Sequence, residues 1–179
     1  LVENFRLVQR EHRRFIEQLA QQADDIADDY LLIRRMSMKT SARNQFLGKV
    51  TLVKPGAVND EIELEVAGGQ KLVAIVTHES TESLGLRVGA EAFALVKSSS
   101  IILVMDDDGA RFSACNRLTG TIARVQTGAV NTEVVLDLPN GASVAAIVTN
   151  ESSAALGLAA GKTASAIFKA SSIILGVPA

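Results

Sequence analysis

The sequence predicts a mainly β protein, in which two small five-stranded barrels follow one another behind an N-terminal helix. First, residues 41–104 and 113–176 repeat each other without a gap at an offset of 72, and about 30 of the 64 aligned pairs are identical. Second, each copy contains short stretches rich in β-branched residues between glycines and prolines. Third, the first 26 residues contain neither Gly nor Pro. We therefore expect a helical linker and dimerisation segment over residues 1–39 and two barrel domains, at 40–105 and 112–179.

The N-terminal segment has the spacing of a helix that packs against another helix. Apolar and aromatic side chains recur at steps of three and four residues, at Phe5, Val8, His12, Phe15, Leu19 and Ile26. A narrow stripe of this kind on an otherwise charged helix suits a partner helix. We expect a helix from Val2 to about Ile26 that pairs with the same helix of a second chain. The alternative is that the stripe packs on the chain's own β domain.

The first repeat contains five predicted strands and one short helix. The strands are Phe46–Lys54, Glu61–Val66, Lys71–Thr77, Ala90–Lys97 and Ser100–Met105. Between the third and the fourth, residues 79–84 are polar with helical spacing, and Gly85 follows them, which predicts one helical turn. The second repeat shows the same pattern. Five short strands with a helix between strands three and four fit a small barrel of the oligonucleotide/oligosaccharide-binding type.

Composition limits the possible partners. The net charge of −2 and the pI near 5.7 provide no basic surface for nucleic acid or an anionic membrane. Aromatic residues make up only 4% of the chain, which argues against base stacking on the barrels. Cys115 is the single cysteine, so no internal disulfide can form. Because no apolar run reaches the length of a membrane span, we expect a cytoplasmic protein without membrane contact.

The sequence gives little support for catalysis. Of the two histidines, His12 lies in the predicted helix and His78 is replaced by Asn150 in the second repeat, so no histidine pair recurs with the spacing of metal ligands. Cys115 has no repeated histidine partner, and no glycine-rich phosphate loop is present. We therefore expect a binding protein that holds no bare metal cation, rather than an enzyme.

Small hydroxyl residues and one lysine are retained in both repeats. Ser41, Thr77, Ser80 and Lys97 recur as Ser113, Thr149, Ser152 and Lys169. Hydroxyl groups, a cationic side chain and the free N–H groups at the start of a short helix are the components of an oxyanion site. Arg43 adds a second cation in the first repeat. The alternative is that the hydroxyl residues cap turns and helices while the lysines are solvated edge residues.

A set of short motifs extends this pattern over residues 40 to 176. The motifs are Thr40-Ser41-Ala42-Arg43-Asn44-Gln45, Gly48, Gly56-Ala57-Val58-Asn59, Thr77-x-x-Ser80, Leu84-Gly85-Leu86, Lys97-x-Ser99 and the tail Lys169-Ala170-Ser171-Ser172-Ile173-Ile174-Leu175. Together they resemble the Mop domain of molybdate-binding proteins. Two families carry tandem Mop domains: the molbindins, which store molybdate in the cytoplasm, and the ModE-type molybdate-responsive transcription regulators.

The resemblance implies a ligand and a site. Molybdate or tungstate, a tetrahedral dianion, is expected to bind between Mop domains of different chains. Ser41 and Arg43 of one chain, with Thr77, Ser80 and Lys97 of its partner, would surround the ion together with nearby backbone N–H groups. The two positive charges of Arg43 and Lys97 would balance the two negative charges of the ligand.

The second repeat differs from this pattern at one position. Cys115 occupies the place of Arg43, so a site built there has one positive charge fewer for the same dianion. We expect this second site to be weaker or empty. Its residues would be Ser113, Asn116, Thr149, Ser152 and Lys169.

The segment before the repeats favours the regulator family. A molbindin begins close to the Ser-Ala-Arg-Asn motif, whereas this chain has about 40 preceding residues that resemble the linker between the DNA-binding and Mop domains of ModE-type proteins. We expect the sensing, homodimeric part of a molybdate-responsive regulator, which would contact DNA only through a winged-helix domain that this sequence lacks. The alternative is a storage protein that forms a larger homo-oligomer.

Overall fold

The computed structural model describes residues 13, 14, 16–18, 20, 21 and 39–178. The chain divides into two units, residues 1–40 and 41–179. In the first unit the described residues between 13 and 21 are helical. All six side chains of the predicted dimerisation stripe lie outside the described residues, so the stripe stays a prediction. Among the described residues, no helix is both long enough and apolar enough to span a membrane.

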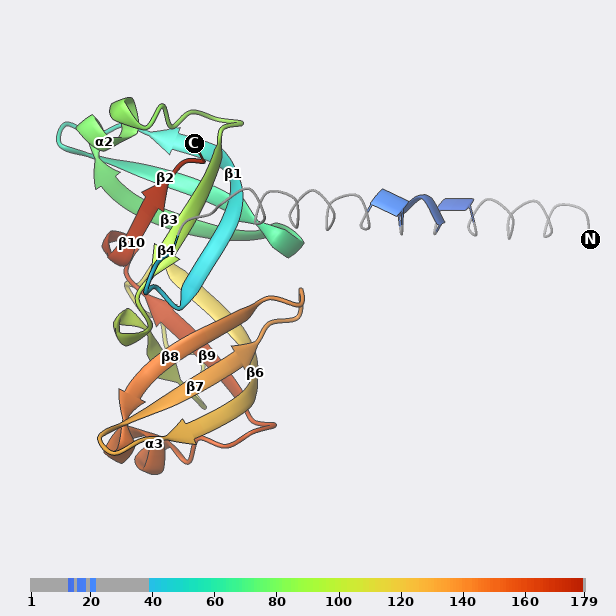
Figure 1. The fold of residues 1–179 in the computed structure, drawn as a ribbon, viewed down its shortest axis with the longest axis vertical. Helices are drawn as coiled ribbons and strands as arrows, with labels where there is room; N and C mark the ends of the chain where they lie inside the picture. Colours follow the sequence, from blue (N-terminus) through green and yellow to red (C-terminus); the bar gives the residue numbers. More distant parts are fainter. Residues whose placement is uncertain (1–12, 15, 19, 22–38, 179) are drawn as a thin grey trace, which may run out of the picture. The chain divides into compact units, whose positions relative to one another are not determined.

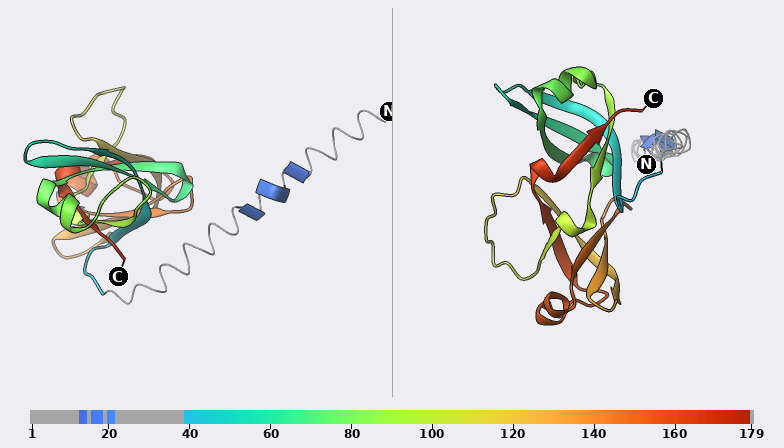
Figure 2. Two further views of the ribbon diagram at one scale, coloured as in Figure 1. Left: turned by 90° about the horizontal axis from the view of Figure 1, so that it is seen from above. Right: turned by 60° about the vertical axis from the view of Figure 1, so that its left-hand side comes forward.

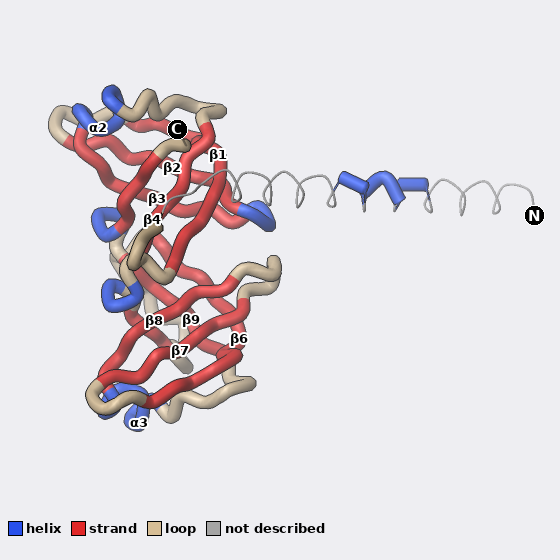
Figure 3. Tube along the Cα trace, in the orientation of Figure 1, coloured by secondary structure: helices blue, strands red, loops and turns tan. Residues whose placement is uncertain are grey.

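The second unit consists of two five-stranded antiparallel sheets (Figures 1 and 3). The first repeat contributes β1 (Asn44–Lys54), β2 (Asn59–Val66), β3 (Gln70–Thr77), β4 (Glu91–Val96) and β5 (Ile102–Val104). The second contributes β6 (Asn116–Thr127), β7 (Asn131–Asp137), β8 (Ser143–Thr149), β9 (Thr163–Phe168) and β10 (Ile173–Gly176). These bounds confirm the predicted mainly β fold with five strands in each repeat.

Short helices occupy equivalent places in the two repeats. The α-helices are α2 (His78–Ser83), which follows β3, and α3 (Asn150–Leu156), which follows β8. Three 3-10 turns complete the fold: η1 (Ala67–Gly69), η2 (Ser98–Ser100) and η3 (Ala170–Ser172). The helical turn that was predicted between the third and fourth strands is therefore present in both copies.

The last strands of the two repeats are exchanged. One sheet has the strand order β10-β4-β1-β2-β3, and the other has β5-β9-β6-β7-β8. In β10, Ile173 pairs with Val96 of β4, while Ile102 of β5 pairs with Ile167 of β9. Figure 1 and the right-hand view of Figure 2 both show the red strand β10 among the strands of the first repeat. Each sheet therefore combines four strands of one repeat with the last strand of the other.

The exchange joins both repeats in one hydrophobic core. Val96 and Phe168, which end the fourth strands, are 0% and 2% exposed, and they belong to the same buried cluster as Ile101 and Ile173. A repeat of about 65 residues is near the lower size limit for an independent core. By burying the last strand of each repeat in the other, the chain builds one larger core.

Gly48 and Gly120 let the first strand of each repeat serve two neighbours. Gly48 on β1 pairs with Val66 of β2 on one side and with Ala92 of β4 on the other. A Cβ atom at Gly48 would lie 2.2 Å from the backbone oxygen of Glu65, and one at Gly120 would lie 2.2 Å from that of Asp137. Only glycine permits this close approach of two strands, which explains its presence in both copies.

Candidate functional site

The retained threonine and serine of each repeat form a helix cap. Thr77 is the N-cap residue of α2, where its Oγ1 accepts the Ser80 N–H at 3.2 Å and lies 2.7 Å from the Ser80 hydroxyl. In α3, Thr149 Oγ1 accepts the Ser152 N–H at 3.1 Å and donates to the Ser152 hydroxyl at 2.8 Å. Both threonines are exposed. The capping role that composition allowed is therefore real, and it holds two hydroxyl groups side by side at the surface.

The lysines lie on turns that pack against the other repeat. Lys97 is exposed and precedes η2, which contacts β8, while Lys169 is exposed and precedes η3, which contacts β3. Strand β3 ends at Thr77. Within residues 39–178, no hydrogen bond or ion pair joins Lys97 to Thr77. No direct bond therefore links the lysine to the cap among the described residues of one chain.

Arg43 forms an ion pair with Glu133 of the second repeat. The Arg43 side chain is 56% exposed, and the Glu133 side chain, on β7, is 16% exposed. The same carboxylate accepts a 2.6 Å hydrogen bond from Arg124. Cys115, which replaces Arg43 in the second repeat, is exposed and carries a free thiol. Arg43, the cation that the sequence assigns to the site, is therefore already paired within the chain. Only the first repeat has this cation.

Asn116 belongs to the core rather than to an exposed cluster. Its side chain is 1% exposed, its Nδ2 donates to the Val73 carbonyl at 2.8 Å, and its Oδ1 accepts the Val73 N–H at 2.8 Å. Ser113, by contrast, is exposed. The structure thus gives Asn116 a structural role, because both polar atoms of its amide are bonded to backbone.

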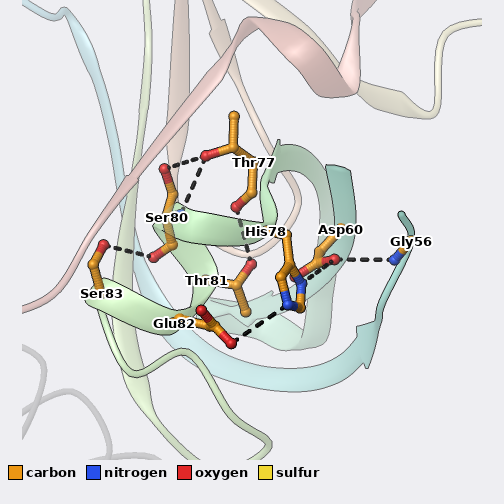
Figure 4. Close-up of polar contacts among 8 residues, drawn as sticks. All are labelled: Gly56, Asp60, Thr77, His78, Ser80, Thr81, Glu82 and Ser83. Carbon is orange, nitrogen blue, oxygen red and sulfur yellow. Dashed lines mark hydrogen bonds and ion pairs between the residues drawn. The ribbon is translucent and has the colours of Figure 1, made fainter. Parts of the chain in front are cut away.

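A charged pair next to the first cap was not part of the sequence-based site. His78 Nδ1 lies 3.0 Å and 3.1 Å from the two carboxylate oxygens of Asp60, and His78 Nε2 lies 3.4 Å from Glu82 (Figure 4). The Gly56 N–H also donates to Asp60, at 3.0 Å. Asp60 is 1% exposed. The pair therefore ties the start of α2 to β2 and to the turn before it.

The pKa values of Asp60 and His78 are shifted in opposite directions. The pKa of Asp60 is lowered, first by hydrogen bonding from Thr81 and then by the Gly56 N–H and by His78, against the opposing effect of burial. The pKa of His78 is raised, first by its hydrogen bond to Asp60 and then by the charges of Asp60 and Glu82. Both shifts favour the charged forms.

The sequence contained a signal for this pair. The alignment of the repeats places Asp60 over Thr132 and His78 over Asn150, so both members change together. In the second repeat, Thr132 Oγ1 donates to Asn150 Oδ1 at 2.7 Å. A charged contact in one repeat thus has a neutral counterpart in the other, and comparing the differences between the repeats would have found it.

The arrangement offers donors for an anion. Paired hydroxyl groups, exposed lysines and an exposed arginine can all donate hydrogen bonds to it. In the part of the chain that the structure describes, no group of three or more His, Cys, Asp or Glu residues could hold a metal ion.

Comparison with known proteins places these repeats in a family. The TOBE domain model matches residues 40–103 and again residues 113–175. The chain belongs to the TOBE domain family. The two TOBE matches coincide with the sequence repeats and with the hydroxyl and lysine residues described above.

The chain is also similar to longer proteins. The chain is 47% identical to the molybdenum transport protein ModE of Herbaspirillum seropedicae over 82% of its own length and 54% of that protein. It is 33% identical to the DNA-binding transcriptional dual regulator ModE of Escherichia coli K12 over 89% of its length and 64% of that protein. The chain therefore spans about half to two thirds of the length of these relatives.

A solved structure shares the TOBE fold. The chain superposes on the cytoplasmic molybdate-binding protein ModG, determined with molybdate bound, with a TM-score of 0.77 and 51% sequence identity. The superposition covers 79% of this chain and 100% of the ModG chain.

Proposed function

We propose that this chain binds molybdate, or tungstate, between TOBE domains of different chains. The observation that carries the proposal is the pair of adjacent hydroxyl groups at Thr77 and Ser80, which the second repeat reproduces at Thr149 and Ser152. Both caps are held in the same geometry although only about half of the aligned residues are identical. ModG, which has the same fold, was determined with molybdate bound.

The expected shell combines residues of two chains. Ser41 and Arg43 of one chain would face Thr77, Ser80 and Lys97 of its partner. The position of Arg43 agrees with this division, because within residues 39–178 Arg43 pairs with Glu133 and not with the Thr77–Ser80 cap. Two cations then balance one dianion, and hydroxyl and backbone donors replace its hydration shell.

We further propose that the chain is the sensing region of a molybdate-responsive transcription regulator. The match to the E. coli regulator covers 89% of this chain, which is more than the two TOBE domains occupy. The match to ModG includes the whole ModG chain but covers only 79% of this chain. Part of the segment before residue 40 is therefore matched in the regulator. Binding between two chains can report molybdate because it favours one arrangement of those chains over another.

The second candidate is a molybdate store, and the observation behind it is that ModG, described as a cytoplasmic molybdate-binding protein, is matched over its whole chain. Oligomer size and stoichiometry separate the two functions. We expect a dimer that binds about two molybdate ions per dimer, as measured by light scattering after size exclusion and by titration calorimetry with sodium molybdate. A trimer or hexamer filled with more ions would support storage instead.

Substitution of the arginine tests the site itself. Arg43→Ala is expected to weaken molybdate binding by about tenfold or more, because it removes one of two charges that balance the ligand. Arg87→Ala is the matched control, since Arg87 is also exposed and forms no ion pair among the described residues. Unchanged affinity in Arg43→Ala would contradict the proposed shell. Titration with sulfate tests whether the site selects the larger oxyanion.

A further inference from the structure

The first cap is joined to the barrel through His78, which follows Thr77 directly. In Figure 4, Thr77 and Ser80 lie on one side of the first turn of α2, and His78 and Asp60 lie on the other. The backbone N–H of His78 donates to the Val58 carbonyl at 2.9 Å, and its imidazole contacts Asp60 at 3.0 Å. Movement of His78 must therefore move the cap residue before it.

The imidazole faces carboxylates from two elements. Asp60 comes from β2 and Glu82 from α2 itself, at 3.0 Å and 3.4 Å. The other strand packed on α2 is β3, whose charged residue, Lys71, bonds instead to Glu63 at 2.7 Å. Among the described residues, the groups against His78 thus favour a protonated ring, and Asp60 is the buried one.

The second repeat holds the same cap without charge. Asn150 Nδ2 donates to the Gly128 carbonyl at 2.9 Å, and Asn150 Oδ1 accepts from Thr132 at 2.7 Å. Its backbone N–H donates to Val130 at 3.2 Å, as the N–H of His78 does to Val58. The capping bonds measure 3.2 Å and 3.1 Å in the two repeats. Two different braces, the charged pair His78–Asp60 and the neutral pair Asn150–Thr132, therefore give one cap geometry.

We infer that His78 and Asp60 are positioning residues for oxyanion binding, and that their charged brace makes the Thr77–Ser80 cap respond to pH while the Asn150–Thr132 brace keeps the second cap independent of pH. The inference rests on the proposed function. When the imidazole loses its proton, the ion pair with the buried Asp60 carboxylate becomes a weaker hydrogen bond between a neutral ring and that carboxylate. The start of α2 is then held less firmly, and the hydroxyl pair is less well oriented for a ligand.

A measurement without ligand tests the brace by itself. In amide NMR spectra recorded from about pH 6 to about pH 9, we expect the Ser80 resonance to shift with the same midpoint as the His78 ring. The Ser152 resonance is the internal control and should stay constant. In the double variant Asp60→Thr with His78→Asn, which installs the pair of the second repeat, Ser80 should also stay constant. If the Ser80 amide resonance does not shift while His78 titrates, the inference is overturned.

Titration with sodium molybdate over the same pH range tests the effect on binding. For the natural sequence we expect affinity at the first cap to fall about tenfold as His78 deprotonates, and the double variant to keep the affinity measured at low pH throughout. His78→Asn alone should bind more weakly at every pH, because it leaves a buried carboxylate without its partner. Rescue by the second substitution separates positioning from a general loss of structure.

Two outcomes count against different claims. Parallel pH profiles for the natural sequence and the double variant would overturn the inference, because the neutral pair would then position the cap no differently. Absence of molybdate binding at all pH values would overturn the proposed function instead, and the ligand-free Ser80 titration would still decide whether His78 controls the cap.

Discussion

Asn44 clamps the backbone of Ala145, a residue of the other repeat. Its Nδ2 donates to the Ala145 carbonyl at 2.8 Å, and its Oδ1 accepts the Ala145 N–H at 2.8 Å. Asn116 makes the same two bonds to Val73, which occupies the position equivalent to Ala145. The two asparagines, 2% and 1% exposed, thus fasten the third strand of each repeat to the first strand of the other. The exchanged strands and these clamps make the two repeats one structural unit.

Replacement of a clamp residue should destabilise the whole unit. Asn44→Ala leaves the N–H and the carbonyl of half-buried Ala145 without these partners, which should lower the free energy of unfolding by about 2 to 4 kcal/mol. Asn116→Ala should cost about the same. Urea denaturation measures both, with the exposed Asn131→Ala as the control. An effect no larger than that of the control would contradict the clamp.

The strand exchange predicts that a cut linker leaves the unit intact. A protease site inserted between Gly109 and Ala110 separates the repeats covalently, but β5 stays paired with β9 and β10 with β4. After cleavage, both fragments should elute together in size exclusion chromatography and separate only in denaturant. Separation in native buffer would show that the last strands pair within their own repeats.

Residue patterns could predict the elements but not this exchange. The alternation of residues such as those in β2, buried at every second position, predicted the strands well. The exchange was not predictable, because the offset of 72 is the same whether the last strand joins its own sheet or the other one. From the sequence, helix capping was only the alternative role of the hydroxyl residues, and the structure shows that role at Thr77. The Arg43–Glu133 contact joins residues 90 positions apart, for which the sequence carried no local signal.

Because Arg43 is paired with Glu133, removal of the Glu133 carboxylate should increase the affinity for molybdate. A dianion that binds Arg43 must displace Glu133, so Glu133→Gln should strengthen molybdate binding by about threefold to tenfold. The matched control is Glu61→Gln, because Glu61 occupies the equivalent position and has no ion pair among the described residues. Titration calorimetry at low and high salt measures both variants. Equal affinities in the two would contradict competition between Glu133 and the ligand.

The cysteine of the second repeat predicts two classes of site. Because Cys115 replaces Arg43, molybdenum anomalous scattering from crystals should show lower occupancy at sites built from Ser113, Thr149 and Lys169. Cys115→Arg should raise that occupancy towards that of the first class, whereas Cys115→Ser should not. Equal occupancy in the natural sequence would refute the distinction.

The charged brace also predicts how stability depends on pH. Because the pKa of His78 is raised above the ordinary value of about 6.5, its contribution to stability is complete below that pH and is lost as the pH rises through the shifted value. Because the pKa of Asp60 is lowered below about 3.9, its contribution is present above that pH and is lost as the pH falls through the shifted value. The double variant Asp60→Thr with His78→Asn should therefore make Tm less dependent on pH at both the acidic and the alkaline end. Glu82→Gln, which alters an exposed partner of His78, should change Tm only slightly and only at the alkaline end. An unchanged plot in the double variant would show that the pair contributes no proton-linked stability.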